Sequence, residues 1–392
     1  TLGLYANVRP CVCYHPFVKT NHPDMNLVIV RENEEDLYAG VEYRQTQDAV
    51  QCLKVITRTA SERIHRYAFE YAVKNNRKKV TCMSKDNIMK MTDGLFHRVF
   101  NEVAKEYPQV QTDHSIIDIG AARIGSKPEQ FDVVVTENLY GDVISDIAAE
   151  VSGSVGLAGS ANVGEDFAMF EAIHGSAPDI AGQGIANPSG LLHGAIMMLI
   201  HLGQGSVAAK IHNAWLKTIE DGIHTGDIYG EHSKEKVGTQ GFAEAVMKRL
   251  GQKPATLPAV DYADGEPADN KATALSKVKL QTKTLVGIDV FVDWTEEVDG
   301  LAEKLQGALG NDLKLHTIAN KGLKIWPDAE IALAPTDLLC CRILPQEANG
   351  TLTHDAIASL LGRLAETGLD FTKTEHLYNF DGERGYTMGQ GE

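Results

Sequence analysis

The sequence predicts an α/β core followed by a small α+β domain, and three observations support this. Between residues 26 and 136, short apolar runs typical of buried strands alternate with amphipathic helical stretches. From Gly141 onward the pattern becomes mostly helical. Residues 252–275 are rich in Pro, Ala and Asp without periodicity, which is typical of a linker. The chain therefore divides into a core at 1–251 and a C-terminal domain at 276–392.

Each element of the core has a local signal. Residues 26–31 (NLVIVR) form an apolar run typical of a buried strand, and residues 36–57 indicate hairpin-like extended structure. A strong helix is expected to open at Ser61, because apolar side chains then follow on one stripe. Later strands are expected at 78–83, 115–119 and 131–136, and later helices from about Ile88 and at 142–151, 191–203 and 209–222.

The C-terminal domain has its own alternation. Residues 278–294 are expected to form strands, and helices are expected at 295–309 and 353–368. That is enough for a small independent core. No constellation of catalytic residues is identified in this part of the sequence.

Three glycines, Gly153, Gly156 and Gly159, suggest a nucleotide-binding loop at first sight. Their spacing differs from GxGxxG, and they follow a helix where the motif requires a strand. A Rossmann fold is therefore not predicted, and the glycines are interpreted as packing and turn positions.

Composition excludes several classes of function. The formal net charge of −16 argues against nucleic acid as a partner, because phosphate binding needs a basic face. No apolar run approaches the length of a transmembrane helix, so we expect no membrane partner. None of the six cysteines forms a CxxC pair, which indicates a reducing compartment, either a bacterial cytoplasm or a mitochondrial matrix.

The strongest chemical signal is the stretch ENLYGDVISDIAAE, residues 137–150. Asp142 and Asp146 are four residues apart in a helical pattern, so both carboxylates project from one face. Mg²⁺ and Mn²⁺ prefer such carboxylate oxygens. A solvated acidic helix face is the alternative, but the pair follows a strand and a turn. Both interpretations remain open from the residues alone.

Three further segments carry candidate site residues. VRENEEDLYAG holds Tyr38 and also Arg31, which is placed either to bind a carboxylate or to form a surface salt bridge. SKDNIMKMTDGLF holds Lys85 and Asn87 just before a helix, where a lysine is also a common cap-region charge. Residues 170–190 form a loop that suits a flat or phosphorylated ligand, with a structural Ω-loop as the alternative.

In this order and spacing, the four segments resemble the isocitrate and 3-isopropylmalate dehydrogenases over about residues 1–250. RENEEDLYAG is similar to the isocitrate branch, and the tail HLYNFDGERGYTMGQGE is similar to the extra C-terminal domain of the long bacterial-type enzymes. The resemblance implies a non-Rossmann α/β core with its N-terminal part missing. The small domain and clasp would span about 5–152, and the cofactor part of the large domain about 153–251.

The resemblance also implies an activity, the metal-dependent oxidative decarboxylation of isocitrate to 2-oxoglutarate and CO₂. Arg9 and Arg31 would hold the isocitrate carboxylates, and Asn87 would lie beside the nicotinamide. Lys85 would take the hydroxyl proton, and Tyr38 would protonate C3 after CO₂ leaves.

The metal site implied by the resemblance is shared between subunits. Asp142 and Asp146 would bind Mg²⁺ or Mn²⁺ together with Asp118 from the other subunit of a homodimer, which would also donate Lys85. The C-terminal domain is a candidate for building a higher oligomer or for binding an effector.

The cofactor expected from the sequence is NAD, in preference to NADP. NADP-linked relatives carry a Lys and a Tyr at the positions of Asp179 and Ile180, so Asp179 is expected to repel a 2′-phosphate. No arginine lies between Gly226 and Lys234, where NADP-linked relatives place one. The residues that match the family's adenine and ribose loop are His174, Gly175, Ser176, Ala177, Asp179, Ile180 and Asn187.

Two alternatives remain open. The same chemistry on homoisocitrate, isopropylmalate or tartrate is possible, because the family's upstream substrate-reading segment is absent from the sequence. The first residues, TLGLYANVRP, look like the middle of a domain. A non-catalytic regulatory subunit is the second alternative, and the retention of Tyr38, Lys85, Asp118, Asp142 and Asp146 counts against it.

Overall fold

The computed structural model describes residues 2–268, 275–328 and 336–391. The chain forms two compact units, one made of Thr1–Ala39 and Lys54–Lys277 and the other of Gly40–Leu53 and Val278–Glu392. Residues 40–53 thus group with the C-terminal part, although they were predicted to belong to the core. Within the described residues, no helix has both the length and the apolar character to cross a membrane.

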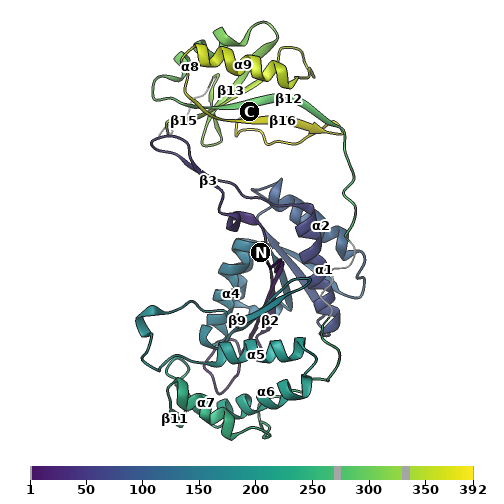
Figure 1. Ribbon diagram of the computed structural model, residues 1–392, viewed down its shortest axis with the longest axis vertical. Coiled ribbons are helices and arrows are strands. Elements are labelled where there is room, and N and C mark those ends of the chain that lie inside the picture. The colour runs from purple at the N-terminus through teal and green to yellow at the C-terminus, as the bar shows by residue number, and fades with distance from the viewer. Residues whose placement is uncertain (1, 269–274, 329–335, 392) are drawn as a thin grey trace. The chain divides into compact units, whose positions relative to one another are not determined.

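The first unit is built on a seven-stranded sheet with the order β6-β5-β7-β2-β1-β8-β9 (Figure 1). Strands β6, β5, β7 and β2 are parallel, and β1, β8 and β9 continue the sheet in antiparallel pairs. The strands are β1 (Ala6–Val12), β2 (Asn26–Glu32), β5 (Lys79–Ser84), β6 (Gln111–Ile116), β7 (Val133–Thr136), β8 (Gly159–Val163) and β9 (Ala168–Ala172).

Helices cover both faces of this sheet (Figure 1). Val28 and Val30 of β2 pack in a cluster with α1 (Arg58–Lys74) and α2 (Thr92–Ala104). Leu27 and Ile29 point to the opposite face, toward α3 (Ile117–Ser126) and α4 (Asn138–Ser152). Successive strand residues alternate between faces, so a strand buried on both sides is apolar throughout. The predicted α/β class with layers on both sides is confirmed.

Helices α5 (Ser189–His201), α6 (Gly205–Glu220) and α7 (Thr239–Lys248) form the rest of the first unit. The carboxylate of Glu220 accepts the backbone N–H groups of residues 255–257 at 2.7–3.1 Å. Asn213 exchanges two hydrogen bonds with the backbone of Val260. The predicted linker is therefore docked on α6 at residues 255–260, and further along the N–H of Ala268 donates to the carbonyl of His201 at the end of α5. Residues 269–274 of the linker lie outside the described residues.

The second unit is a sheet with the order β14-β13-β15-β12-β16-β17 and two helices. Side chains of α8 (Val298–Leu309) and α9 (His354–Glu366) share one apolar cluster with the central strands. The hairpin β3–β4 (Glu42–Arg44 and Val50–Cys52) joins this unit through Asp337, which accepts hydrogen bonds from Thr46 and from the backbone of Asp48. The strands are β12 (Lys283–Asp293), β13 (Leu313–Asn320), β14 (Leu323–Trp326), β15 (Leu338–Pro345), β16 (Phe371–Phe380) and β17 (Glu383–Arg384).

Several element boundaries differ from those expected. Helix α1 begins at Arg58, because the Thr57 side chain caps it by accepting the N–H of Ala60 at 3.2 Å. Helix α2 begins at Thr92, later than the expected start near Ile88. The strand expected at 115–119 ends at Ile116, and Asp118 lies in the first turn of α3. Short 3-10 helices occupy Asp36–Ala39, Pro128–Gln130, Val155–Leu157 and Pro178–Ile180, and Ile223–His224 pairs with Glu235–Lys236 as β10 and β11.

All three glycines have the packing and turn roles that were predicted. Gly156 lies in the 3-10 turn Val155–Leu157, where a Cβ would lie 2.9 Å from Asp227 Oδ2. Gly153 ends α4 with a φ of +138°, a conformation that side chains rarely adopt. A Cβ on Gly159 would lie 2.6 Å from the backbone nitrogen of Gly194, so β8 and α5 approach as closely as backbones allow.

Candidate active site

Two arginines and a tyrosine converge on the carboxylate of Asp142 in α4. Arg9 Nη1 lies 3.2 Å from Asp142 Oδ1, and Arg31 forms an ion pair with the same oxygen. The hydroxyl of Tyr38 donates to Asp142 Oδ2 at 2.5 Å. Asp146, one turn further along α4, lies 3.7 Å from Arg9 Nη1. The structure therefore brings together five of the residues predicted from separate segments, and we call this group the arginine–aspartate corner.

Strand register explains why the two arginines share one face. In the antiparallel β1–β2 pair, Arg9 lies opposite Ile29, two residues before Arg31 on β2. Residues two apart on a strand point to the same side, so both guanidinium groups face α4. A Cβ on Gly141 would lie 2.5 Å from Arg31 Cγ, so glycine at this position leaves room for the arginine. This role of Gly141 was not predicted from the sequence.

Both arginines are buried and tied to neutral groups. Arg9 is 8% exposed and donates to Asn7 and Ser145, while Arg31 is 5% exposed and donates through Nε and Nη2 to Asn138 Oδ1. These bonds leave each guanidinium in a fixed orientation toward the helix. The corner is therefore a preorganised anion site, where a carboxylate ligand would meet two oriented cations.

The pKa values of the two acid–base groups Asp142 and Tyr38 are shifted in opposite directions. Burial alone would raise the pKa of Asp142, but the hydrogen bond from Tyr38 and the charges of Arg31 and Arg9 lower it overall. The hydrogen bond to Asp142, followed by burial, raises the pKa of Tyr38. Asp142 is thus ionised at neutral pH while Tyr38 keeps its proton.

Lys85 and Asp118 form a second group. Lys85 follows β5, Asp118 lies on α3, and Lys85 Nζ is 2.9 Å from Asp118 Oδ1. The Asp118 side chain is 68% exposed, and Asn87 is also exposed. Among the described residues, no hydrogen bond or ion pair joins this group to the arginine–aspartate corner. One chain thus presents the predicted catalytic and metal residues as two separate groups.

A buried ion network, which was not predicted from the sequence, connects the loops that carry both groups. Lys54 Nζ lies 2.6 Å from Glu137 and 2.7 Å from Asp93, and both carboxylate side chains are fully buried. Asp93 also accepts the backbone N–H of Lys85 at 2.7 Å, and Glu137 directly precedes α4. Burial lowers the pKa of Lys54, but Glu137 and Asp93 outweigh it and raise this pKa overall. Lys54 lies in the unremarkable stretch QCLKVI, so no local pattern indicates its role.

The predicted cofactor loop is exposed and is shaped by its backbone. His174, Gly175, Ser176, Ala177 and Asp179 are exposed, Ile180 is half-buried, and Ala177 has a φ of +42°. Within the described part of the chain, no hydrogen bond or ion pair reaches the Asp179 carboxylate.

Asn187 is buried at the end of this loop. Its amide donates to Asp227 at 2.9 Å, and its carbonyl accepts from the backbone of Ser189 at 3.0 Å. Thr239 fixes the preceding residues by donating to the carbonyl of Gly184 at 2.8 Å and to that of Ala186 at 2.5 Å. Lys236 lies three residues before Thr239, so a lysine-bearing segment is joined to the cofactor loop.

A cavity of about 430 Å³ lies elsewhere in the first unit. Aliphatic and aromatic side chains line much of it, together with the imidazoles of His193 and His212, whose pKa values burial lowers to about 4 and about 3. None of the residues proposed for catalysis or metal binding lines this cavity. The convergence of charged groups, rather than cavity volume, therefore identifies the candidate site.

Comparison with known proteins gives the class of this fold and site. Residues 1–246 match the isocitrate/isopropylmalate dehydrogenase family, and residues 283–392 match the bacterial isocitrate dehydrogenase C-terminal domain. The chain belongs to the isocitrate/isopropylmalate dehydrogenase family. The resemblance inferred from the four segments is confirmed, as is the α/β fold with an additional C-terminal domain.

Individual proteins of known name or structure are also similar to this chain. The chain is 57% identical over 394 residues to an isocitrate dehydrogenase [NADP] of Rickettsia bellii, covering all of this chain and 81% of that protein. It is 39% identical to an isocitrate dehydrogenase [NADP] of Thermus thermophilus, covering 99% of this chain and 78% of that one. The crystal structure of the TT0538 protein from T. thermophilus superimposes with a TM-score of 0.92 at 38% identity, covering 99% of this chain and 78% of that chain.

These relatives overturn the prediction that the cofactor is NAD. The similar proteins from Rickettsia and Thermus, which are 39–57% identical, carry the designation NADP. The prediction that Asp179 repels a 2′-phosphate requires this carboxylate to lie in a partly buried site, where its charge acts strongly. In the structure Asp179 is exposed, and solvent screens an exposed charge. The segment between Gly226 and Lys234 lacks an arginine, but it ends at a lysine, and Lys236 lies two residues further along the chain.

Proposed function

We propose that this chain catalyses the NADP-linked oxidative decarboxylation of isocitrate to 2-oxoglutarate and CO₂. The observation that carries the proposal is the arginine–aspartate corner, which lies in a chain 57% identical to an isocitrate dehydrogenase [NADP]. A substrate with several carboxylates suits two oriented guanidinium groups better than a neutral substrate does.

Substrate orientation is the first task of the corner. Arg9 and Arg31 hold the carboxylates of isocitrate, exchanging part of their contact with Asp142 for the substrate. Asn7, Ser145 and Asn138 keep the guanidinium groups in place during this exchange. Orienting groups that are already fixed lower the entropic cost of reaching the transition state.

Proton transfers are assigned to two residues. Lys85 takes the proton of the C2 hydroxyl as the C2 hydrogen leaves as hydride, and the bond to the β-carboxylate then breaks to release CO₂. Tyr38 delivers a proton to C3, which completes 2-oxoglutarate. The raised pKa of Tyr38 supports the acid role, because the phenol holds its proton until C3 becomes basic.

The residues present fit a hard divalent cation and a phosphorylated cofactor. Asp142 and Asp146 offer carboxylate oxygens from one face of α4, and Asp146 is 64% exposed, so this donor set suits Mg²⁺ or Mn²⁺. Such an ion supplies Lewis-acid polarisation of substrate oxygens, and NADP supplies the hydride acceptor. Lys236 lies in the segment that Thr239 joins to the cofactor loop, with Lys234 two residues before it, so this segment offers cations for a 2′-phosphate.

The two separate groups indicate that a complete site needs two copies of the chain. We infer a homodimer in which Lys85 and Asp118 of one copy meet the arginine–aspartate corner of the other. The pairing of Lys85 with Asp118 and of Asp142 with Arg9 within one chain supports this division.

The proposed reaction is tested by reduction of NADP and of NAD with isocitrate and Mn²⁺, with and without EDTA. We expect rapid NADPH formation that EDTA abolishes, and slower reduction of NAD. Faster turnover with 3-isopropylmalate or homoisocitrate, or no reduction of either cofactor, would contradict the proposal.

Sharing of sites is tested by mixing two inactive variants, Lys85→Ala and Asp146→Asn. After random exchange in equal amounts, half of the dimers are mixed and each has one intact site, so about a quarter of wild-type turnover should return. Confirmed exchange without any recovery would argue against shared sites.

A further inference from the structure

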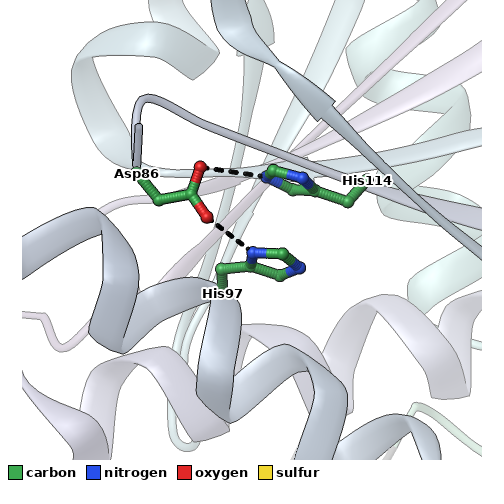
Figure 2. A group of neighbouring side chains, drawn as sticks. All are labelled: Asp86, His97 and His114. Atoms are coloured by element: carbon green, nitrogen blue, oxygen red, sulfur yellow. Dashed lines mark hydrogen bonds and ion pairs between the residues drawn. The ribbon is translucent and has the colours of Figure 1, made fainter. Parts of the chain in front are cut away.

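We propose that Asp86, His97 and His114 form a second metal site, for a transition-metal ion of the zinc class, outside the arginine–aspartate corner. Three separate elements supply these residues: Asp86 follows β5, His97 lies on α2 and His114 lies on the edge strand β6 (Figure 2). The set contains none of the residues assigned to the reaction, although Asp86 is the chain neighbour of Lys85.

The three side chains converge on one point. Asp86 Oδ2 lies 2.7 Å from His97 Nδ1, and Asp86 Oδ1 lies 3.7 Å from His114 Nε2 (Figure 2). One ligand atom from each residue lies within 4.8 Å of the other two. The two imidazole rings are stacked with centroids 3.7 Å apart and planes 12° apart, so their nitrogens reach the carboxylate from the same side.

One of these separations is close to that of a metal site. Zinc binds imidazole nitrogen and carboxylate oxygen at about 2.0–2.2 Å, so two ligands of a tetrahedral site lie about 3.4 Å apart. The Asp86–His114 separation of 3.7 Å is too long for a hydrogen bond and near this value. Asp86 and His97, now joined by a hydrogen bond of 2.7 Å, would move apart to this separation when an ion binds.

Burial also favours a metal ligand set. Each side chain is only 22–23% exposed, so the three residues are held by packing, while water would still reach a bound ion.

A fourth polar group is already in place. The hydroxyl of Ser84, which is fully buried, lies 3.0 Å from His114 Nε2. When His114 Nε2 binds an ion, it gives up this contact with Ser84. A tetrahedral ion bound by three protein side chains keeps a fourth position for a water molecule, to which the released Ser84 hydroxyl would hydrogen-bond.

The ligand chemistry separates this site from the one in the corner. Two imidazoles and one carboxylate suit Zn²⁺, Co²⁺ or Cu²⁺, whereas the all-carboxylate set of Asp142 and Asp146 suits Mg²⁺ or Mn²⁺. An excess of Mg²⁺ therefore fills the corner while leaving the His–His–Asp site to zinc. A bound ion would join the loop that carries Lys85 to α2 and to β6.

Zinc binding by the full chain in excess Mg²⁺ tests the site. A chromophoric chelator measures the Zn²⁺ bound by the wild type and by His97→Gln, His114→Gln and Asp86→Asn, with the fold checked by circular dichroism. We expect one more zinc ion per wild-type chain than in any of the three variants, or at least about tenfold weaker binding in them. X-ray absorption of the zinc-loaded wild type should show imidazole ligands at about 2.0–2.1 Å.

His22→Gln is the matched control, because His22 lies 3.9 Å from Glu129 in the same unit as a histidine–carboxylate pair without a second histidine. This variant should keep the wild-type zinc stoichiometry. Unchanged zinc binding in folded His97→Gln, or zinc with only oxygen ligands by X-ray absorption, would overturn the proposal. If a variant fails to fold, the X-ray absorption of the wild type still decides.

Discussion

The arginine–aspartate corner and the cofactor loop are held in very different ways. In the corner, buried arginines reach from two strands to a helix, and Arg9, Arg31 and Asp142 each have several partners at fixed distances. In the loop, exposed side chains sit on a backbone whose shape comes from hydrogen bonds at Gly184, Ala186 and Asn187. The identity of a side chain therefore strongly limits which ligand the arginine–aspartate corner can bind, and only weakly limits which cofactor the loop can bind.

The interaction energy between two charges shows how large the difference between the corner and the loop is. Two unit charges 4 Å apart interact by about 1 kcal/mol in water and by about 4 kcal/mol at the effective dielectric constant of a protein surface cleft. Asp142, beside two buried guanidinium groups, lies nearer the second case. Asp179 lies nearer the first, so its charge alone is too weak to select a cofactor.

The largest effect is expected from Asp142→Asn in the corner. The amide keeps a hydrogen-bond acceptor but removes the charge that balances Arg9 and Arg31 and that would bind the metal. We expect turnover with isocitrate, NADP and Mn²⁺ to fall on the order of 10³-fold while the circular dichroism spectrum is unchanged. Asp166→Asn, at an exposed aspartate, is the control and should keep wild-type turnover. Near-normal turnover of Asp142→Asn would contradict the assignment of Asp142 to the active site.

Lys54→Met tests whether the region behind the corner depends on its buried ions. The substitution leaves the buried carboxylates of Asp93 and Glu137 without their cation. Breaking a buried ion pair in this way costs about 3–5 kcal/mol of the free energy of unfolding, measurable by urea denaturation. Lys217→Met, which breaks a partly exposed pair with Asp221, should cost at most about 1 kcal/mol. Equal costs in the two variants would show that the buried network contributes no more than a surface pair.

The fold was largely predictable from local patterns. Apolar runs such as those within 26–31 and 131–136 lie on strands β2 and β7, because strands buried on both faces leave a nearly unbroken apolar signal. Boundaries were less predictable: the apolar stretch around Ile117 resembles a strand, but it begins α3. The grouping of residues 40–53 with the C-terminal unit depends on the contact of the hairpin with Asp337, which no local pattern encodes.

The candidate site was predictable where motifs carry the chemistry. The segments around Arg31, Tyr38 and Asp142 each have a recognisable composition, and the structure brings them together. Lys54 and Gly141 were missed, because one acts through long-range ion pairs and the other through the absence of a side chain. The prediction of NAD as the cofactor was wrong, because the exposure of Asp179 is a property of the folded loop and not of its sequence.

The smallest effect is expected from Asp179→Asn in the cofactor loop. Because the carboxylate is exposed and screened, removing its charge changes the interaction with a 2′-phosphate by about 1 kcal/mol or less. The ratio of kcat/KM for NADP to that for NAD should therefore change by less than about fivefold. Steady-state kinetics with both cofactors measures this ratio, with Asp166→Asn again as the control. A change of more than tenfold would mean that cofactor binding buries Asp179, and the loop would then constrain chemistry as strongly as the corner does.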